Sequence, residues 1–435
     1  MIISREKYLN ELIERKNNSL IKVITGLRRC GKSFLLFNLF FDYLIKNGTD
    51  NNCIIRFAFD NDEDIDKLDD YFPEEETKIY SKNKKTYVIN SKKFRAYIKD
   101  LTKDNEYYYI LLDEIQLLED FVGTLNGFLK HTNFDVYVTG SNSMMLSKDI
   151  ITEFRGRGDQ IHVFPLSFKE YYNARKIAFD DAYLEYQFFG GMPYTLEIKS
   201  EERKQDYLKG LFSEIYIKDI VDRNDIKNDS HFYELLSILS SSIGSYTNPT
   251  NIENTFKSEL KVAYHHDTIK KHIDYMKDSF LISEANKYDL KGKKYIGANS
   301  KYYFTDLGLR NSLINFRQNE PTHIMENIIY NELVNRGYSV DVGIVEIYEK
   351  DKKGTNRPKQ IETDFVCNRL NNKIYIQSAY SMENIDKLNQ EKRSLINIKD
   401  NFRKIIIVKD TIKKYYTEEG IEVISLKEFL LEDIV

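Results

Sequence analysis

The chain has 435 residues, which at about 150 residues per domain predicts about three domains, each large enough for its own core. Hydrophobic residues make up 41% and charged residues 30%, which excludes a disordered chain and an integral membrane protein. The formal charge of −4, from 64 basic and 68 acidic residues, excludes a histone-like polycation but not a local basic surface.

The spacing of the cysteines and the length of the apolar runs predict where in the cell the protein is found. Cys30, Cys53 and Cys367 are far apart and show no CxxC spacing, so we expect neither disulfides nor a zinc ribbon, and a reducing cytoplasm fits best. The N-terminal residues carry charges throughout, so we expect no signal peptide. No apolar run approaches the roughly 18 residues that span a bilayer, so no membrane association is expected.

The first part of the chain alternates strand and helix patterns. A helical pattern covers 4–17, and a second helix is predicted over 32–45. Apolar segments predict five strands, at 19–25, 53–59, 107–112, 134–139 and 160–166. Strands joined by helical connections predict a parallel sheet that is covered on both faces.

The segment between the second and third strands divides by charge. Residues 60–76 are strongly acidic and residues 81–103 strongly basic. We interpret both as solvated helical faces, with a nucleic-acid-contacting stripe as the alternative for the basic one. The lysines and arginine concerned are Lys82, Lys84, Lys85, Lys92, Lys93, Arg95, Lys99 and Lys103.

Further along the chain, the pattern is helical from about 168 to 228, with a turn predicted at Gly190-Gly191-Met192-Pro193. From about 231 to 315, three helices and a hairpin with a turn near Lys291-Gly292 resemble a winged helix. From about 322 the pattern is helix, three strands, helix, strand and helix, which predicts a small α/β unit.

The strongest motif lies between the first strand and its helix. Gly26-Leu-Arg-Arg-Cys-Gly31-Lys32-Ser33 satisfies the P-loop pattern in the strand–loop–helix context that the pattern requires. Glycines allow backbone N–H groups to surround phosphates, Lys32 would reach the β- and γ-phosphates, and the Ser33 hydroxyl would bind Mg²⁺. The predicted nucleotide-contacting residues are Gly26, Leu27, Arg28, Arg29, Cys30, Gly31, Lys32, Ser33 and Phe34.

The third strand ends in Asp113-Glu114, a Walker B pattern. Asp113 would hold Mg²⁺, and Glu114 would polarise the attacking water as a general base. Because Glu114 has no evident role in simply holding a nucleotide, the pair indicates hydrolysis of ATP.

Two later sites are candidates for sensing or stabilising the γ-phosphate. Ser141 or Asn142, at the end of the fourth strand, could contact the phosphate or the water, although a plain turn is the alternative. Arg155 or Arg157 could act as an arginine finger on a neighbouring subunit, and we favour Arg157. This interpretation makes a homo-oligomer a candidate assembly, and an ordinary surface loop is again the alternative.

The chain resembles the bacterial and archaeal AAA-like ATPases that carry a C-terminal nuclease-like domain of unknown function. The pieces that carry the resemblance lie in order along nearly the whole chain: IKVITGLRRCGKSFLL, ILLDEIQ, VTGSNS, RGR with PLSFKEYY, FFGGMPYTL, IKDIVDRNDIKN and IYIQSAY. The resemblance implies an additional-strand P-loop core, a winged helix and a small α/β tail, with ATP and Mg²⁺ as cofactors. It implies no particular physiological role.

The tail has the layout of a PD-(D/E)xK nuclease but departs from it at the decisive position. Glu326 on a helix and Asp364 on a strand, near Glu362, match the carboxylates that bind Mg²⁺ in such enzymes. Gln377 is a poorer ligand than a carboxylate, and Ala379 replaces the lysine. We therefore expect a degenerate site rather than active cleavage. The lysines that might substitute are Lys387 and Lys392.

The winged-helix segment contains a candidate recognition helix, His265-His266-Asp267-Thr268-Ile269-Lys270-Lys271-His272. Its basic residues could face phosphates, together with lysines of the wing, although many winged helices bind only other proteins. The histidine spacing does not predict a metal site. The candidate DNA contacts are Lys270, Lys271, His272, Lys291, Lys293 and Lys294.

The sequence predicts an α/β fold: a P-loop core (1–167), a helical lid (168–230), a winged-helix-like domain (231–320) and a PD-(D/E)xK-like tail (321–435). The first hypothesis is an ATPase whose nucleotide state moves the winged helix and the tail, with DNA as a candidate partner. The second is a slow nucleotide-dependent switch or scaffold that binds a protein partner. The third is an ATP-regulated, metal-dependent nuclease.

Overall fold

The structure is a computed structural model, and it describes residues 2–69, 77–81, 86–140, 154, 156–227, 229–317, 320–350, 355–382 and 385–432. The chain divides into two compact units. The N-terminal unit comprises Met1–Pro165 with Asp278–Phe280, and the C-terminal unit comprises Leu166–Lys277 with Leu281–Val435. Within the described residues, no helix is long and apolar enough to cross a membrane.

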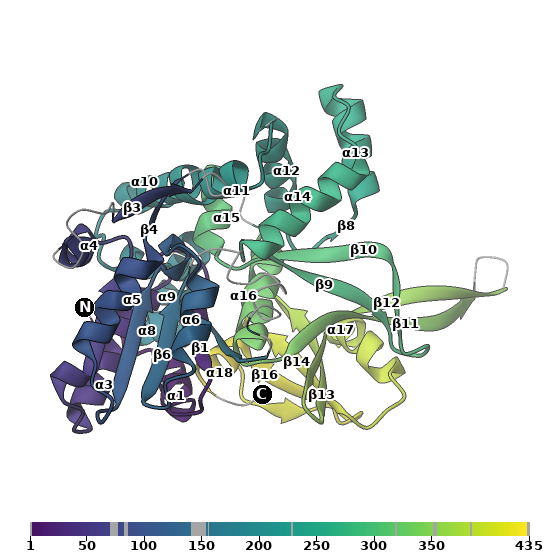
Figure 1. Cartoon of the computed structure of the whole chain (residues 1–435). Helices are drawn as coiled ribbons and strands as arrows, with labels where there is room; N and C mark the ends of the chain where they lie inside the picture. The colour runs from purple at the N-terminus through teal and green to yellow at the C-terminus, as the bar shows by residue number, and fades with distance from the viewer. Residues whose placement is uncertain are drawn as a thin grey trace. The chain divides into compact units, whose positions relative to one another are not determined.

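A five-stranded, all-parallel sheet forms the centre of the N-terminal unit (Figure 1). The strand order is β2-β5-β6-β1-β7. The sequence predicted these five strands and their parallel arrangement, and the structure confirms the sheet; the fifth strand begins and ends earlier than expected. The bounds are β1 Ile21–Thr25, β2 Ile54–Ala58, β5 Tyr108–Asp113, β6 Phe134–Thr139 and β7 Gly158–His162.

Helices cover both faces of this sheet because its strands are apolar on both sides. On one face, Phe94 of α5 packs against Phe57 of β2, with the ring centres 5.1 Å apart, and Phe128 of α6 lies 6.3 Å from Phe94. On the other face, the ring of Phe40 lies 4.6 Å from that of Tyr137 in β6. The helical segments are α1 Glu6–Glu14, the continuous run α2 Lys32–Phe34, η1 Leu35–Phe40 and α3 Phe41–Lys46, α4 Asp62–Asp69, η3 Ile115–Leu117, α5 Ser91–Leu101 and α6 Phe121–Phe128.

The charged segment between β2 and β5 is not wholly helical. Strands β3 (Lys78–Ser81) and β4 (Thr86–Ile89) form an antiparallel hairpin before α5. Lys93 is fully buried and donates a hydrogen bond to Thr77 Oγ1 at 2.9 Å, so it does not belong to a solvated face as predicted. Lys82, Lys84 and Lys85 lie outside the described residues.

The C-terminal unit begins with helices. The Gly190-Gly191 turn ends α9 as predicted, with Gly190 at φ 67°. Gly191 donates its N–H to Asp306 Oδ2 at 2.7 Å, which joins this turn to the start of α15. The bounds are α8 Phe168–Arg175, α9 Phe179–Phe189, η5 Pro193–Leu196, α10 Glu201–Gly210, η6 Leu211–Ile217, α11 Lys218–Arg223, α12 Asp229–Ser241, α13 Pro249–Thr255, η7 Phe256–Leu260, α14 His266–Asp278 and α15 Leu307–Leu313.

One nine-stranded sheet runs through the rest of the C-terminal unit, in the order β15-β16-β14-β13-β12-β11-β9-β10-β8. The predicted hairpin β9–β10 joins it because β9 pairs in parallel with β11, and β11 and β12 extend as a long two-stranded arm (Figure 1). Its elements are β8 Tyr246–Thr247, β9 Ile282–Asp289, β10 Lys294–Phe304, α16 Pro321–Asn335, β11 Ser339–Lys350, β12 Asn356–Arg369, β13 Asn372–Ala379, α17 Ile385–Asn397, β14 Arg403–Val408, β15 Tyr415–Tyr416, β16 Glu422–Ser425 and α18 Leu426–Leu431.

The continuous sheet bears on the predicted domain boundaries. The boundaries predicted at 230 and 320 fall inside one compact unit, whereas the one at 167 lies beside the division between the two units. The predicted wing and the predicted tail thus share backbone hydrogen bonds, and the four-segment division stays a prediction.

Candidate functional site

The loop between β1 and α2 has a backbone that requires glycine at two positions. Gly26 has φ 140° and Gly31 has φ 102°, values that side-chain-bearing residues rarely adopt. A Cβ atom at Gly26 would lie 2.1 Å from the carbonyl oxygen of Val163. Cys30 is buried beneath the loop, and its thiol donates to the same oxygen at 3.3 Å. The motif predicted from sequence is therefore a closely packed turn above the ends of β1 and β7.

Lys32, the first residue of α2, is 4% exposed, and its ammonium group lies inside the loop. Its Nζ donates hydrogen bonds to the carbonyl oxygens of Gly26 at 3.1 Å and Leu27 at 2.9 Å. Ser33, the next residue, is exposed. The loop thus concentrates positive charge and backbone groups at the start of a helix, an arrangement that suits a phosphate group.

Asp113 ends β5, and hydroxyl groups from two other segments bond to its buried carboxylate. The Ser33 hydroxyl of the P-loop and the Thr139 hydroxyl at the end of β6 both donate to it. Burial raises the pKa of Asp113, and these two hydrogen bonds oppose the rise. A carboxylate with an adjacent serine hydroxyl is a donor set that suits Mg²⁺, so the residues fit the ion that the P-loop fold implies.

Glu114 follows in a left-handed conformation, with φ 51°. Its N–H donates to Thr139 Oγ1 at 3.2 Å, and its carboxylate accepts a hydrogen bond from the side-chain amide of Gln116. Thr139 therefore orients both acidic residues through one hydroxyl. Neither Thr139 nor Gln116 is among the site residues predicted from the sequence. The signal for Thr139 is its position as the polar last residue of an apolar strand, β6.

Asp60 is a further acidic residue at this edge of the sheet. It follows β2, next to β5, and lines a cavity of 780 Å³ together with Asp113. Burial and the charge of Glu114 raise the pKa of Asp60, whereas Arg28 lowers it. The sequence predicts a solvated acidic face for this segment, but its first residue, Asp60, lines the same cavity as Asp113 and interacts electrostatically with Glu114.

Of the remaining predicted phosphate-sensing residues, the structure describes Arg157 alone, and it does not lie at this edge. Arg157 is exposed, and its carbonyl accepts the N–H of Ile21, the first residue of β1, at 2.9 Å. Because the P-loop follows the last residue of β1, Arg157 lies at the opposite edge of the sheet within one chain. Its role toward a neighbouring subunit stays a prediction. Ser141, Asn142 and Arg155 lie outside the described residues.

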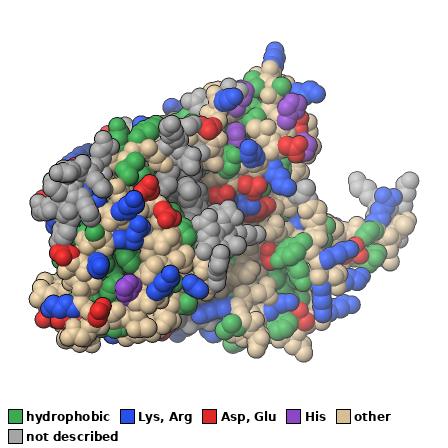
Figure 2. All heavy atoms as spheres, in the orientation of Figure 1, with side chains coloured by type: hydrophobic (Ala, Val, Ile, Leu, Met, Phe, Trp, Pro, Cys, Tyr) green, Lys and Arg blue, Asp and Glu red, His purple; other side chains and the backbone are tan. Residues whose placement is uncertain are grey.

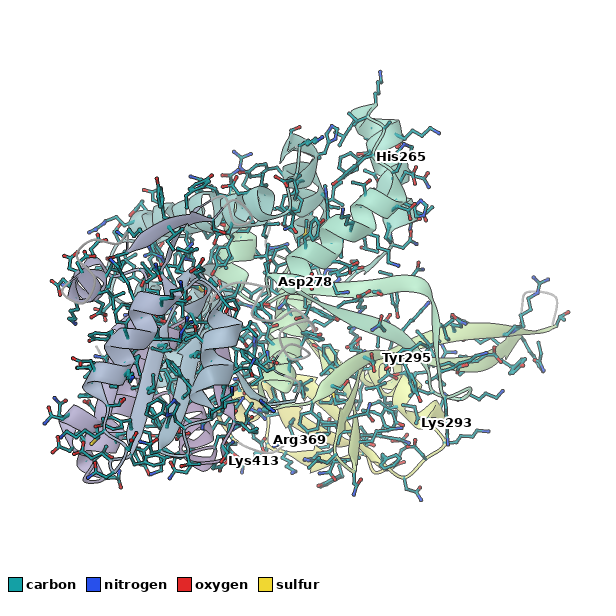
Figure 3. All side chains as sticks on the ribbon, in the orientation of Figure 1. His265, Asp278, Lys293, Tyr295, Arg369 and Lys413 are labelled. Atoms are coloured by element: carbon teal, nitrogen blue, oxygen red, sulfur yellow. The ribbon has the colours of Figure 1, made fainter. Side chains whose placement is uncertain are left out.

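In α14, the predicted recognition helix, the His272 side chain is buried and does not face solvent, where DNA would bind. His272 is 9% exposed, its Nδ1 bonds to the hydroxyl of Tyr264, and burial lowers its pKa to about 4. Lys270 and Lys271 are exposed. Figure 3 labels His265 at the start of this helix, and the Nδ1 atom of His265 lies 3.8 Å from Glu253. The prediction that His272 faces a phosphate backbone is therefore wrong, because its side chain packs inside the C-terminal unit.

In the tail, the structure brings Glu326 of α16 and Asp364 of β12 into one buried cluster. Gln377 is adjacent: its amide oxygen accepts the Asp364 N–H at 3.4 Å, and its amide nitrogen donates to Glu391 of α17 at 3.3 Å. The suggested substitute lysines pair elsewhere, Lys387 with Glu391 and Lys392 with Glu419. Over the described part of the chain, no group of three or more His, Cys, Asp or Glu side chains is arranged to hold a metal.

Comparison with known proteins identifies relatives of the whole chain. An uncharacterized protein of Haemophilus influenzae is 34% identical over 440 residues, which cover 99% of both chains. The chain belongs to the same family as this protein. An uncharacterized protein of Methanocaldococcus jannaschii is 28% identical over 457 residues, covering 99% of this chain and 90% of that one.

Within the chain, residues 18–172 match the AAA domain family, and residues 180–320 match a domain of unknown function. The AAA match and the P-loop geometry identify the N-terminal unit as an AAA-type ATPase domain, as the sequence predicted. The second match spans the predicted lid and winged helix, and it confirms neither.

Similarity to solved structures is weak. AMPPCP-bound DnaA from Aquifex aeolicus is 13% identical and covers 63% of this chain and 88% of its own, with a TM-score of 0.31. A Vibrio cholerae protein covers 94% of both chains at 11% identity, with a TM-score of 0.20. The ATPase assignment therefore rests on the site residues and the AAA match, not on these structures.

Proposed function

We propose that the protein hydrolyses ATP in the presence of Mg²⁺ and couples its nucleotide state to movement of the C-terminal unit, with DNA as the partner. The observation that carries the hydrolysis step is the hydrogen-bonded set at Asp113, in which Ser33 of the P-loop and Thr139 of β6 both donate to one carboxylate. Three segments of the chain thereby meet where the P-loop would hold the phosphates.

Each residue has a role that its contacts support. The P-loop backbone and Lys32 would bind the phosphates, after Lys32 exchanges the loop carbonyls for phosphate oxygens. Ser33 and Asp113 would hold Mg²⁺, which neutralises phosphate charge when bound. Glu114 would accept a proton from the attacking water, with Gln116 and Thr139 fixing the orientation of its carboxylate and backbone.

Two substitutions test this mechanism. Lys32→Ala should abolish binding of a fluorescent ATP analogue, whereas Glu114→Gln should keep binding and lower kcat by about 10²- to 10⁴-fold, the usual contribution of a general base. Glu119→Gln is the matched control, since Glu119 is an exposed acid of the same segment. Wild-type turnover in Glu114→Gln would contradict the assigned role. A specific activity that rises with protein concentration would support Arg157 as a finger, and a flat one would count against it.

The order of elements supports a winged helix in the C-terminal unit. Helix α12 is followed by β8, helices α13 and α14, and the hairpin β9–β10, and β8 pairs with β10. This order, in which α14 directly precedes the hairpin, matches that of winged helices that insert a helix into the major groove. Lys270 and Lys271 on α14 are exposed and available for phosphate contacts.

The hairpin turn and the arm favour a nucleic acid among the candidate partners. Lys291, Lys293 and Lys294 are exposed at the turn, beside Tyr295, which is 64% exposed. Figure 2 shows Lys and Arg side chains around this turn and along the β11–β12 arm, and Figure 3 labels Lys293 and Tyr295 there. Basic side chains beside an exposed aromatic ring suit a phosphate backbone and its bases.

ATPase activity with and without single- and double-stranded DNA tests the partner. DNA should stimulate turnover, and the double variant Lys293→Glu/Lys294→Glu should weaken DNA binding about tenfold or more, with a shallower salt dependence. The matched control, Lys399→Glu/Lys413→Glu, reverses two exposed lysines of the tail. If DNA does not change the turnover rate, or if the two double variants weaken DNA binding equally, the proposed DNA partner is wrong. A protein partner is then the favoured alternative.

A further inference from the structure

Lys301 is a buried cation in the C-terminal unit that the sequence analysis did not single out. It lies on β10, paired with Ala285 of β9 on one side and Tyr246 of β8 on the other. Its side chain is 6% exposed, and Nζ lies 2.8 Å from Glu326 Oε1 and 2.6 Å from Glu362 Oε1. One ammonium group therefore bridges a helix carboxylate and a strand carboxylate, both from the predicted tail.

The carboxylates around Lys301 are themselves held in place. The Tyr303 hydroxyl donates to Glu326 Oε1 at 2.6 Å, and the N–H of Ser378 donates to Asp364 Oδ2 at 2.7 Å. Burial and the charges of Glu326 and Glu362 raise the pKa of Asp364 well above its usual range, and Lys301 opposes this rise. Three carboxyl groups thus meet in one buried cluster, and the ammonium of Lys301 lies between two of them.

The ammonium of Lys301 lies between two carboxylates, where a nuclease of this layout would bind a metal ion. In a PD-(D/E)xK layout, the helix and strand carboxylates face one another across a divalent cation. Here the helix carboxylate, Glu326, and the strand carboxylate, Glu362, share the ammonium of Lys301. Buried charges are stable only when they are paired, so displacing Lys301 would leave an ammonium without its partners in the protein interior.

We propose that Lys301 is the internal cation of this cluster: it takes the place of a divalent metal and ties the hairpin β9–β10 to α16 and β12. While Lys301 is present, the cluster binds no divalent cation. The tail then acts as a rigid support for the hairpin and not as a metal-dependent nuclease. This inference concerns only the C-terminal unit, so it stands or fails separately from ATP hydrolysis by the N-terminal unit.

Thermal unfolding of the nucleotide-free protein in EDTA and in millimolar MnCl₂ tests the proposal. Lys301→Met should lower the melting temperature in EDTA by about 6 °C or more, because buried carboxylates lose their counter-ion. Mn²⁺ should restore at least half of the loss, since a cation again bridges the carboxylates. Lys277→Met is the control: Lys277 also pairs with two carboxylates, at 2.6 and 3.2 Å, but it is 33% exposed. It should lose less and gain nothing from Mn²⁺.

A second measurement keeps the proposal falsifiable if Lys301→Met does not fold. Mn²⁺ binding, followed by electron paramagnetic resonance, should be the same in wild type and in Glu362→Gln, whose side chain is 28% exposed. Weaker Mn²⁺ binding in Glu362→Gln would overturn the proposal, since the cluster would then hold a metal despite Lys301. A folded Lys301→Met that is as stable as wild type in EDTA, or that Mn²⁺ does not stabilise, would overturn it as well.

Discussion

A buried ion pair between β1 and β6 should control the stability of the ATPase domain. Lys22 is fully buried and Asp135 is 2% exposed, and their side chains form a salt bridge. Asp135 Oδ2 also accepts hydrogen bonds from the Tyr137 hydroxyl at 2.9 Å and from the Asn17 N–H at 3.0 Å. Burial lowers the pKa of Lys22, whereas Asp135 raises it, so removing Asp135 would leave the ammonium in the core without its counter-ion.

The expected magnitude follows from the burial of both charges. Each single substitution, Asp135→Leu or Lys22→Met, should cost about 3–5 kcal/mol of unfolding free energy, because one buried charge is left unpaired. The double variant removes both charges while keeping similar side-chain volumes, so it should lie within about 2 kcal/mol of wild type. Since a domain has about 5–15 kcal/mol in total, each single substitution removes a large fraction of it.

Urea denaturation followed by circular dichroism measures these differences. Two compact units need not unfold together, and the transition of the ATPase domain is the one that ATP shifts to higher urea. Lys22 lies near the start of β1 and the P-loop follows its end, so the folded double variant should bind nucleotide normally. A single substitution that costs less than about 1 kcal/mol, or a double variant that loses the sum of the two, would refute the reasoning.

Two further predictions concern the turn after α9, which is hydrogen-bonded to the start of α15. Gly191→Ala should destabilise the C-terminal unit by about 2–4 kcal/mol, because the added Cβ would lie 2.3 Å from the carbonyl oxygen of Leu166. Gly210→Ala is the control: a Cβ there would meet nothing within 4 Å, so the variant should be as stable as wild type or more stable. Equal urea midpoints for the two variants would contradict the prediction. Burial raises the pKa of Asp306 to about 6 from 3.8. The folded state therefore keeps a proton that the unfolded state releases, so this carboxyl group stabilises below pH 4 and loses up to about 3 kcal/mol as pH rises to 6. Asp306→Asn should flatten that dependence, and an unchanged slope would count against it.

The parallel sheet and the P-loop could be predicted from the sequence because their signals are local. An apolar strand of the parallel sheet is buried on both faces, and its run of Val, Ile, Leu and Tyr residues is visible without any partner. Gly26, Gly31, Lys32 and Ser33 lie on one continuous loop, so their spacing alone indicates the phosphate site.

The second layer of the site could not be predicted in the same way. Thr139 contacts Asp113, and Asp60 lines the same cavity as Asp113, because β6 and β2 are the neighbours of β5 in the sheet. The order of strands in a sheet cannot be predicted from any one segment of the sequence. His272 was assigned to DNA by its place in a basic run, but the helical period turns it toward Tyr264.

What the sequence determined by itself was the chemistry of contiguous residues: the phosphate loop, the acidic strand end and the missing lysine at Ala379. What only the tertiary structure decided was which distant residues complete them. Lys301 and Glu362 lie far apart in the chain and in different predicted domains, yet the pairing of β9 with β11 carries β10 into the sheet of the tail. Strand pairing brings together residues that are distant in sequence, so only the tertiary structure shows that the ammonium of Lys301 lies between Glu326 and Glu362.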